Sequence, residues 1–146
     1  MGKKLLHTTG CDEEGHIIHV NEAERGGIYT CPLCRERIIA RNEGKSQRPH
    51  FAHFKKTESG CNGETLLLHL FRQKAVILLN ERILRKVAFP LHWSCPLCNR
   101  HYEKDMLQQV SFLATDFSID GHRPDITLLD DKSQPLIAIM LLIRKK

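Results

Sequence analysis

Two copies of the tetrapeptide Cys-Pro-Leu-Cys constrain this chain more than any other feature of its sequence. They occupy residues 31–34 and 95–98, and together they contain four of the six cysteines. Two intervening residues let both thiolates of a pair reach one tetrahedral metal ion, as in structural zinc sites. The pattern therefore predicts reduced, metal-binding thiols in place of disulfides, and with them a cytoplasmic location.

The first cysteine pair is followed by enough further ligands to close a zinc site. His50, His53 and Cys61 all come before the next long apolar segment. If residues 50–53 form a regular strand, the two imidazoles point to opposite faces, so only one of them binds the metal. We predict a zinc site made of Cys31, Cys34, His53 and Cys61.

The second cysteine pair leaves two arrangements open. His92, Cys95, Cys98 and His101 follow one another at three-residue intervals and offer four ligands locally, although so tight a spacing makes a tetrahedron awkward. The alternative combines Cys95 and Cys98 with Cys31 and Cys34 in one four-cysteine ribbon. Cys11 has no partner nearby and is interpreted as a free or core thiol.

Length and charge narrow the class of protein. The 146 residues suffice for one core with a small metal-bound lobe. The formal charge of +5 favours an anionic partner, of which nucleic acid is the leading candidate. The longest apolar run, residues 136–143, is too short to span a membrane, and the first residues lack a secretory signal. We therefore expect no membrane association.

Hydrophobic patterning predicts a mixed α+β protein with two parts. Residues 1–62 form a β-rich lobe with strands near 16–20, 37–41 and 48–54. A helix over residues 64–86, capped by Asn62, opens the second part, residues 63–146. Three strands follow near 110–117, 123–129 and 136–143. The last is apolar on both faces, which predicts a central strand.

Four blocks of residues resemble a known family, the competence CoiA-like proteins. The blocks are residues 29–34, residues 50–53, Cys61 with Glu64 and His69, and residues 123–125. The resemblance implies a zinc-binding lobe at residues 1–62 joined to a truncated restriction-endonuclease-like, or PD-(D/E)XK, α/β core at residues 63–146. The segment 92–101 would then be a Cys-x-x-Cys insertion in that core.

The resemblance also assigns catalytic roles. Asp125 matches the strand aspartate and Glu64 the helix glutamate that hold Mg²⁺ or Mn²⁺ in such nucleases. Met140 and Leu142, however, stand where the family has its second acid and its Lys or Gln, so the catalytic half-site is incomplete. Asp116 is a candidate replacement carboxylate.

Two main hypotheses about function follow. The first is a zinc-containing nucleic-acid-binding protein, catalytically impaired, that acts as a DNA-binding adaptor or inhibitor in competence or phage defence. Its phosphate contacts would come from Arg48, Lys55, Lys56 and Arg123, with Phe51 or Phe54 stacking on bases. The alternative is an active nuclease that uses Asp125, Glu64 and Asp116. A third hypothesis, a module that binds a protein partner, depends on the apolar final strand being an open edge.

Overall fold

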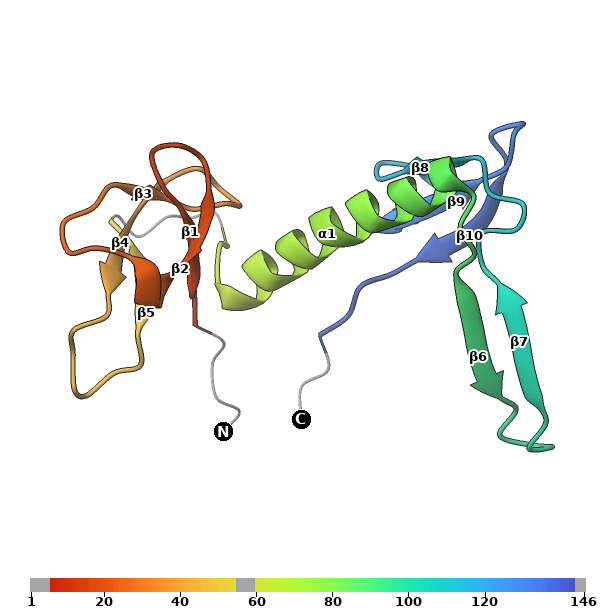
Figure 1. The fold of residues 1–146 in the computed structure, drawn as a ribbon, viewed down its shortest axis with the longest axis horizontal. Helices are drawn as coiled ribbons and strands as arrows, with labels where there is room; N and C mark the ends of the chain where they lie inside the picture. The colour runs from red at the N-terminus through yellow and green to blue at the C-terminus, as the bar shows by residue number, and fades with distance from the viewer. Residues whose placement is uncertain (1–5, 55–59, 144–146) are drawn as a thin grey trace. The chain divides into compact units, whose positions relative to one another are not determined.

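The computed structural model describes residues 6–54 and 60–143. The chain divides into two compact units, Met1–Phe71 with Ile143–Lys146, and Arg72–Leu142. The division falls inside helix α1 (Gly63–Arg85), which is labelled in Figure 1. Among the described residues, no helix combines the length and apolarity needed to cross a membrane.

The first unit is built on a five-stranded antiparallel sheet in the order β2-β1-β3-β4-β5. The strands are β1 (Thr9–Cys11), β2 (Ile17–His19), β3 (Tyr29–Thr30), β4 (Arg37–Arg41) and β5 (His50–His53), with a 3-10 turn η1 (Val20–Glu22) after β2. The strands expected near residues 16–20, 37–41 and 48–54 are therefore confirmed. The backbone N–H of Phe51 donates to the carbonyl of His7 at 2.6 Å, which joins the chain just before β1 to the edge strand β5.

The core of this unit is small. Val20, Tyr29, Cys31, Ile38 and Phe51 are buried together, with Ala23 beside them. The ring of Phe51 is only 2% exposed and packs against Tyr29 with ring centroids 5.5 Å apart. The expectation that Phe51 stacks on nucleic-acid bases is therefore wrong, because its ring is needed to fill this core.

Helix α1 begins where the sequence predicts. The side-chain oxygen of Asn62 accepts hydrogen bonds from the backbone N–H groups of Glu64 and Thr65, at 2.9 and 3.0 Å. This is the N-cap interaction that satisfies two otherwise unpaired donors. Lys86, with φ of 52°, follows the last helical residue, Arg85.

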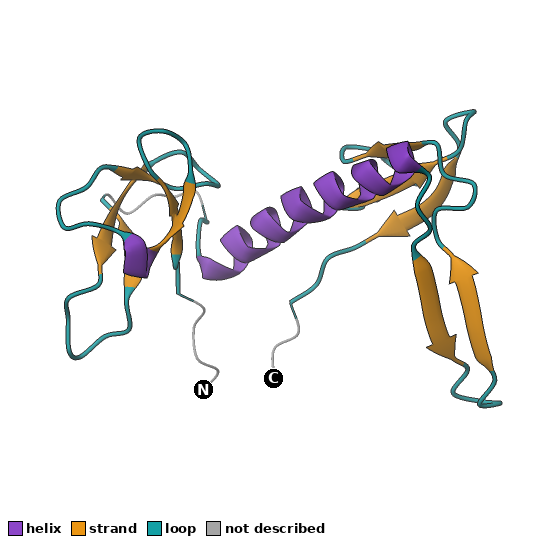
Figure 2. Ribbon diagram, viewed as in Figure 1, coloured by secondary structure: helices purple, strands orange, loops and turns teal. Residues whose placement is uncertain are grey.

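The second unit contains a three-stranded antiparallel sheet in the order β10-β9-β8 (Figure 2). The strands are β8 (Phe112–Ala114), β9 (Ile126–Leu129) and β10 (Pro135–Ile139). Ile126 and Leu128 of β9 are fully buried and pack with Leu79 of α1 and with Leu107. The mixed α+β class is confirmed.

The prediction that the last strand is central is wrong. β9 is the central strand, and β10 pairs only with β9 among the described strands. The turn at Asp130, whose carboxylate accepts from the N–H groups of Lys132 and Gln134, makes β10 the hairpin partner of β9. β9 is central because β8 pairs with its other side, and no other described strand pairs with β10. The apolar residues of β10 are left partly exposed, with Leu136 at 41%.

The second cysteine pair lies at the turn of a separate two-stranded hairpin. Its strands are β6 (Pro90–Ser94) and β7 (His101–Asp105). The carboxylate of Asp105 accepts from the N–H groups of Phe89 and Leu107, at 2.8 and 3.0 Å, and so fixes the base of the hairpin to the rest of the second unit. Apart from Asp105, all residues of both strands are exposed.

Candidate metal centre

The first unit brings together the four side chains that the cysteine spacing singles out. Cys31 and Cys34 lie in the turn between β3 and β4, His53 ends β5, and Cys61 comes just before α1. Their ligand atoms all lie within 4.8 Å of one another. Cys34 Sγ is 3.2 Å from His53 Nε2, and Cys31 Sγ is 3.4 Å from Cys61 Sγ. Tetrahedral zinc with ordinary bond lengths separates its ligand atoms by about 3.3–3.8 Å, so this cluster can hold such an ion.

The local backbone of the Cys31–Cys34 turn prepares the two thiols for a metal. The N–H of Cys31 donates to the carbonyl of Glu36 at 2.8 Å, and the N–H of Arg35 donates to the carbonyl of Cys31 at 2.9 Å. Arg35 takes the left-handed conformation, with φ of 64°, that closes the turn. The N–H of Leu33 points at Cys31 Sγ at 3.4 Å, where it stabilises negative charge on sulfur.

Burial shapes the electrostatics of the cluster. It raises the pKa of Cys61, and hydrogen bonding and charge repulsion from Cys31 and Cys34 raise it further. Burial also raises the pKa of Cys31. A metal ion must therefore displace protons from these thiols, and its affinity falls as the pH is lowered.

His7 is a neighbour of the cluster that the sequence analysis missed. Its side chain is 7% exposed, its Nε2 lies 3.7 Å from Cys31 Sγ, and its ring stacks on that of His53 with centroids 5.3 Å apart. Burial, reinforced by the charges of His53 and His50, lowers the pKa of His7 to about 4. The imidazole is therefore neutral at pH 7, and it supports the ligands from beside them. No local signal reveals it, because His7 reaches the cluster through its pairing with β5.

The other histidine of β5 lies apart from the cluster. His50 bonds through Nδ1 to the carbonyl of Arg48 at 2.8 Å, whereas His53 faces Cys34. Alternation along the strand explains this difference, as predicted. His53 and Cys61 complete the group around Cys31 and Cys34 within the first unit. Cys95 and Cys98 lie in the second unit.

The candidate catalytic residues belong to both units. Glu64 lies in the first turn of α1, in the first unit; Asp116 is exposed on a bend after β8; and Asp125 comes just before β9. The carboxylate of Asp125 accepts a hydrogen bond from the N–H of Leu141 at 2.8 Å. Across residues 6–54 and 60–143, the group formed by Cys31, Cys34, His53 and Cys61 is the only one of three or more such side chains placed to share a metal.

Met140 lies outside the strand in which the sequence predicts it. β10 ends at Ile139, so Met140 follows the strand, and the backbone N–H of Asp125 donates to the carbonyl of Ile139.

The candidate phosphate contacts Arg48 and Arg123 are both exposed, each in a loop that precedes a strand. Lys55 and Lys56 fall outside the described residues.

Comparison with known proteins supports the family resemblance for the first unit. Residues 15–62 match the family described as competence protein CoiA, N-terminal domain. The matched segment includes all four clustered residues, from Cys31 to Cys61, and leaves out His7 and everything after residue 62. No curated protein and no solved structure matches the chain. The match and the cluster together fit a CoiA-like, zinc-binding protein.

Replacing a clustered cysteine should unfold the first unit. We expect Cys31→Ser to lower the zinc content by about one ion per chain and to abolish the folded signal of this unit, because metal binding and folding are coupled in so small a lobe. Elemental analysis and amide hydrogen exchange measure the two effects. Cys11→Ser, in β1 and outside the cluster, is the matched control and should change neither. A folded, metal-free preparation of the unaltered chain would contradict the assignment.

His7→Ala tests whether His7 supports the ligands or is itself one. We expect the zinc content to stay unchanged while zinc affinity falls about 10-fold, the usual effect of removing a group that orients metal ligands. Competition with a chelator of known affinity measures the change. His50→Ala, whose imidazole lies apart from the cluster, should have little effect. Loss of the bound ion in His7→Ala would instead make His7 a ligand.

Proposed function

We propose that this chain is a zinc-containing nucleic-acid-binding protein that acts as a DNA-binding adaptor or inhibitor on a CoiA-like scaffold. One observation carries the proposal: the β4–β5 hairpin that contributes His53 to the metal cluster also presents exposed, unpaired guanidinium groups. A closed metal cluster at one end of a hairpin holds both strands rigidly. Positive groups on those strands are then fixed in position for phosphates.

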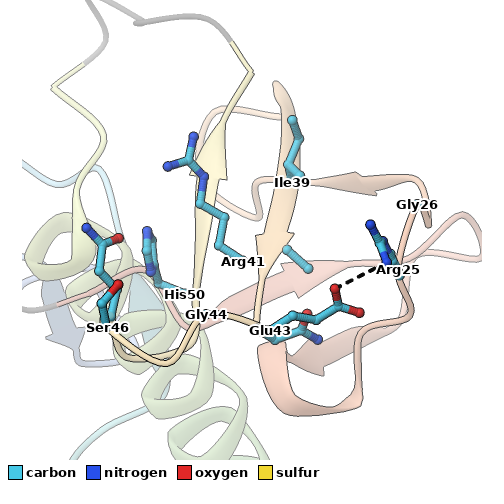
Figure 3. A pocket seen from close by; sticks show the side chains of 11 residues that line it. Arg25, Gly26, Ile39, Arg41, Glu43, Gly44, Ser46 and His50 are labelled. Atoms are coloured by element: carbon cyan, nitrogen blue, oxygen red, sulfur yellow. Dashed lines mark ion pairs between the residues drawn. The ribbon is translucent and has the colours of Figure 1, made fainter.

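A pocket at the far end of this hairpin supports phosphate contact. It has a volume of about 390 Å³, and the cross-strand partners Arg41 of β4 and His50 of β5 both line it (Figure 3). Arg25, also in the wall, pairs with Glu43 at 3.5 Å. In the part of the chain that the structure describes, neither Arg41 nor Arg48 has an acidic partner within ion-pair distance. Their charges are therefore available to an anionic ligand.

The other end of the hairpin offers a stacking surface. The ring of Phe54 is 62% exposed, and the guanidinium carbon of Arg37 lies 5.6 Å from its centroid. An exposed ring with a cation against it is suited to stacking on an unpaired base while contacting the adjacent phosphate. Arg37 and Arg41 both point to the exposed face of β4, about 13 Å apart along the strand. A strand of nucleic acid lying along β4 and β5 would contact both ends.

Lys55 and Lys56 follow Phe54 directly in sequence and are proposed to extend this surface, together with Arg48. Arg123 belongs to the second unit and is proposed as a separate phosphate contact. These assignments depend on the charge and sequence position of each residue.

Salt dependence tests the proposed contact. Each phosphate that a cation neutralises releases counterions, so affinity for DNA should fall steeply as salt rises. We expect Arg41→Ala with Arg48→Ala to weaken binding about 10-fold at low salt and to reduce the slope of log K against log salt by about two. Fluorescence anisotropy with labelled single-stranded and double-stranded DNA measures both.

Lys74→Ala with Arg85→Ala is the matched control, because it removes the same charge from exposed positions of α1. An equal loss of affinity in this control would mean that net charge alone drives binding. No binding by the unaltered chain at low salt would favour the alternative function, binding of a protein partner.

Catalytic impairment is the second part of the proposal. A phosphodiesterase needs carboxylates free to hold a hard divalent cation. The Asp125 carboxylate already accepts a hydrogen bond from the N–H of Leu141. The residue before Leu141 is Met140, whose thioether is a poor ligand for such a cation. The alternative, a nuclease, requires Asp116 and Glu64 to complete a cation site with Asp125.

A cleavage assay distinguishes a catalytically impaired protein from an active nuclease. We expect no metal-dependent cleavage of DNA or RNA by the unaltered chain with Mg²⁺ or Mn²⁺. We expect Met140→Glu to improve Mg²⁺ binding, because it adds a hard oxygen ligand next to Leu141, whose N–H contacts Asp125. Cleavage that Asp125→Ala abolishes, and that the control Asp131→Ala in the exposed β9–β10 turn leaves intact, would establish the nuclease instead.

A further inference from the structure

The two Cys-Pro-Leu-Cys turns have the same local structure. In the first, Tyr29 pairs with Ile38 and Thr30 with Arg37 across the turn. In the second, Trp93 pairs with Tyr102 and Ser94 with His101, in the same register relative to the cysteines. The Cys95 N–H donates to the carbonyl of Arg100, and the Asn99 N–H to the carbonyl of Cys95, both at 2.9 Å. These bonds reproduce, position for position, those of the Cys31–Cys34 turn.

The match extends to the sulfur atoms. Asn99 takes the left-handed conformation, with φ of 53°, at the position that Arg35 occupies in the first turn. The backbone N–H of Leu33 lies 3.4 Å from Cys31 Sγ, and Leu97 holds the same position in the second turn. Cys95 and Cys98 are therefore organised for a metal in the same way as the first pair.

What differs is the source of the remaining ligands. In the first unit, β5 pairs against β4, placing His53 opposite Ile38, and Cys61 completes the group. In the second unit, the described part of the chain contains no third strand beside β7, and it places no third metal-binding side chain together with Cys95 and Cys98. The second turn is thus half of a tetrahedral site.

The two histidines that flank this turn are already engaged within the hairpin. His101 Nδ1 lies 2.7 Å from the hydroxyl of Ser94, its cross-strand partner. His92 Nδ1 lies 3.7 Å from the carboxylate of Glu103, also its cross-strand partner. Among the described residues, neither histidine is placed with Cys95 and Cys98 so that the three could share an ion.

We propose that Cys95 and Cys98 bind zinc together with the same two cysteines of a second copy of this chain, so that one four-cysteine ion joins two hairpins at their tips. A two-fold axis through a tetrahedral ion exchanges one pair of ligands for the other, so two identical half-sites complete it with no further group. Each pair of thiols releases its protons to solvent as the ion binds.

The surroundings of the turn suit a second copy. Four thiolates around Zn²⁺ carry a net charge of −2, and Arg100, exposed and without an acidic partner among the described residues, brings one positive charge from each chain. Leu97, at the tip, is 95% exposed, and the stacked rings of Trp93 and Tyr102 are 48% and 42% exposed. Joining two tips covers apolar surface that a single chain leaves in water.

Mass and metal content test the proposal on the full chain loaded with zinc ions alone. By light scattering and native mass spectrometry we expect a dimer with about three zinc ions per two chains, one in each first unit and one shared. Cys95→Ser with Cys98→Ser should give a monomer with about one zinc ion per chain. Retention of that ion reports that the first unit of the variant is folded.

Two control variants test whether the dimer and its shared ion depend specifically on Cys95 and Cys98. Cys11→Ser, and His92→Ala with His101→Ala, should leave both mass and zinc content as in the unaltered chain. A monomer with two zinc ions per chain, or loss of the second ion in the histidine variant, would show that the hairpin closes its own site and would overturn the proposal. So would a dimer that persists without Cys95 and Cys98, or an unaltered monomer whose second cysteine pair holds no metal. None of these readouts depends on nucleic-acid binding.

Discussion

Convergence of three thiols and one imidazole on a single point is the interaction on which the first unit depends. Its buried core contains few large side chains, chiefly Val20, Tyr29, Ile38 and Phe51. So small an apolar core contributes limited stability by itself. The cluster links the β3–β4 turn, the end of β5 and the segment before α1, which are separated in sequence and otherwise share only a short sheet. A metal ion bound at this point would tie these three segments together.

The position of the cluster also explains which side chains of β5 face away from it. His53 faces the metal ligands, and alternation along β5 turns His50 away from them toward the pocket that Arg41 lines. The exposed guanidinium groups therefore lie on a hairpin whose strands are held by the cluster and by the buried Phe51. Positioning charged groups on a rigid element lowers the entropy lost when a ligand binds. The proposed phosphate contacts and the metal cluster therefore lie on opposite faces of the same two strands.

The two cysteine turns show that the local sequence decides the conformation of the turn, whereas the neighbouring strands decide how many further ligands it has. Cys-Pro-Leu-Cys followed by a left-handed residue forms the same hydrogen-bonded turn in both units. In the first unit a neighbouring strand supplies further ligands; in the second, the turn projects from a two-stranded hairpin. The same motif thus closes one site and leaves the other with two ligands.

Features that depend on neighbouring residues can be predicted from the sequence. They are the cysteine turns, the cap at Asn62, the helix, the turn at Asp130 and the opposite orientations of His50 and His53, which follow from short spacings and backbone geometry. Three other features became evident only in the folded chain: the central strand of the second unit, the burial of Phe51, and the contact of His7 with Cys31. Each of these depends on pairing between residues far apart in the chain, where the closure of the sheet, and not the local pattern, selects the neighbour.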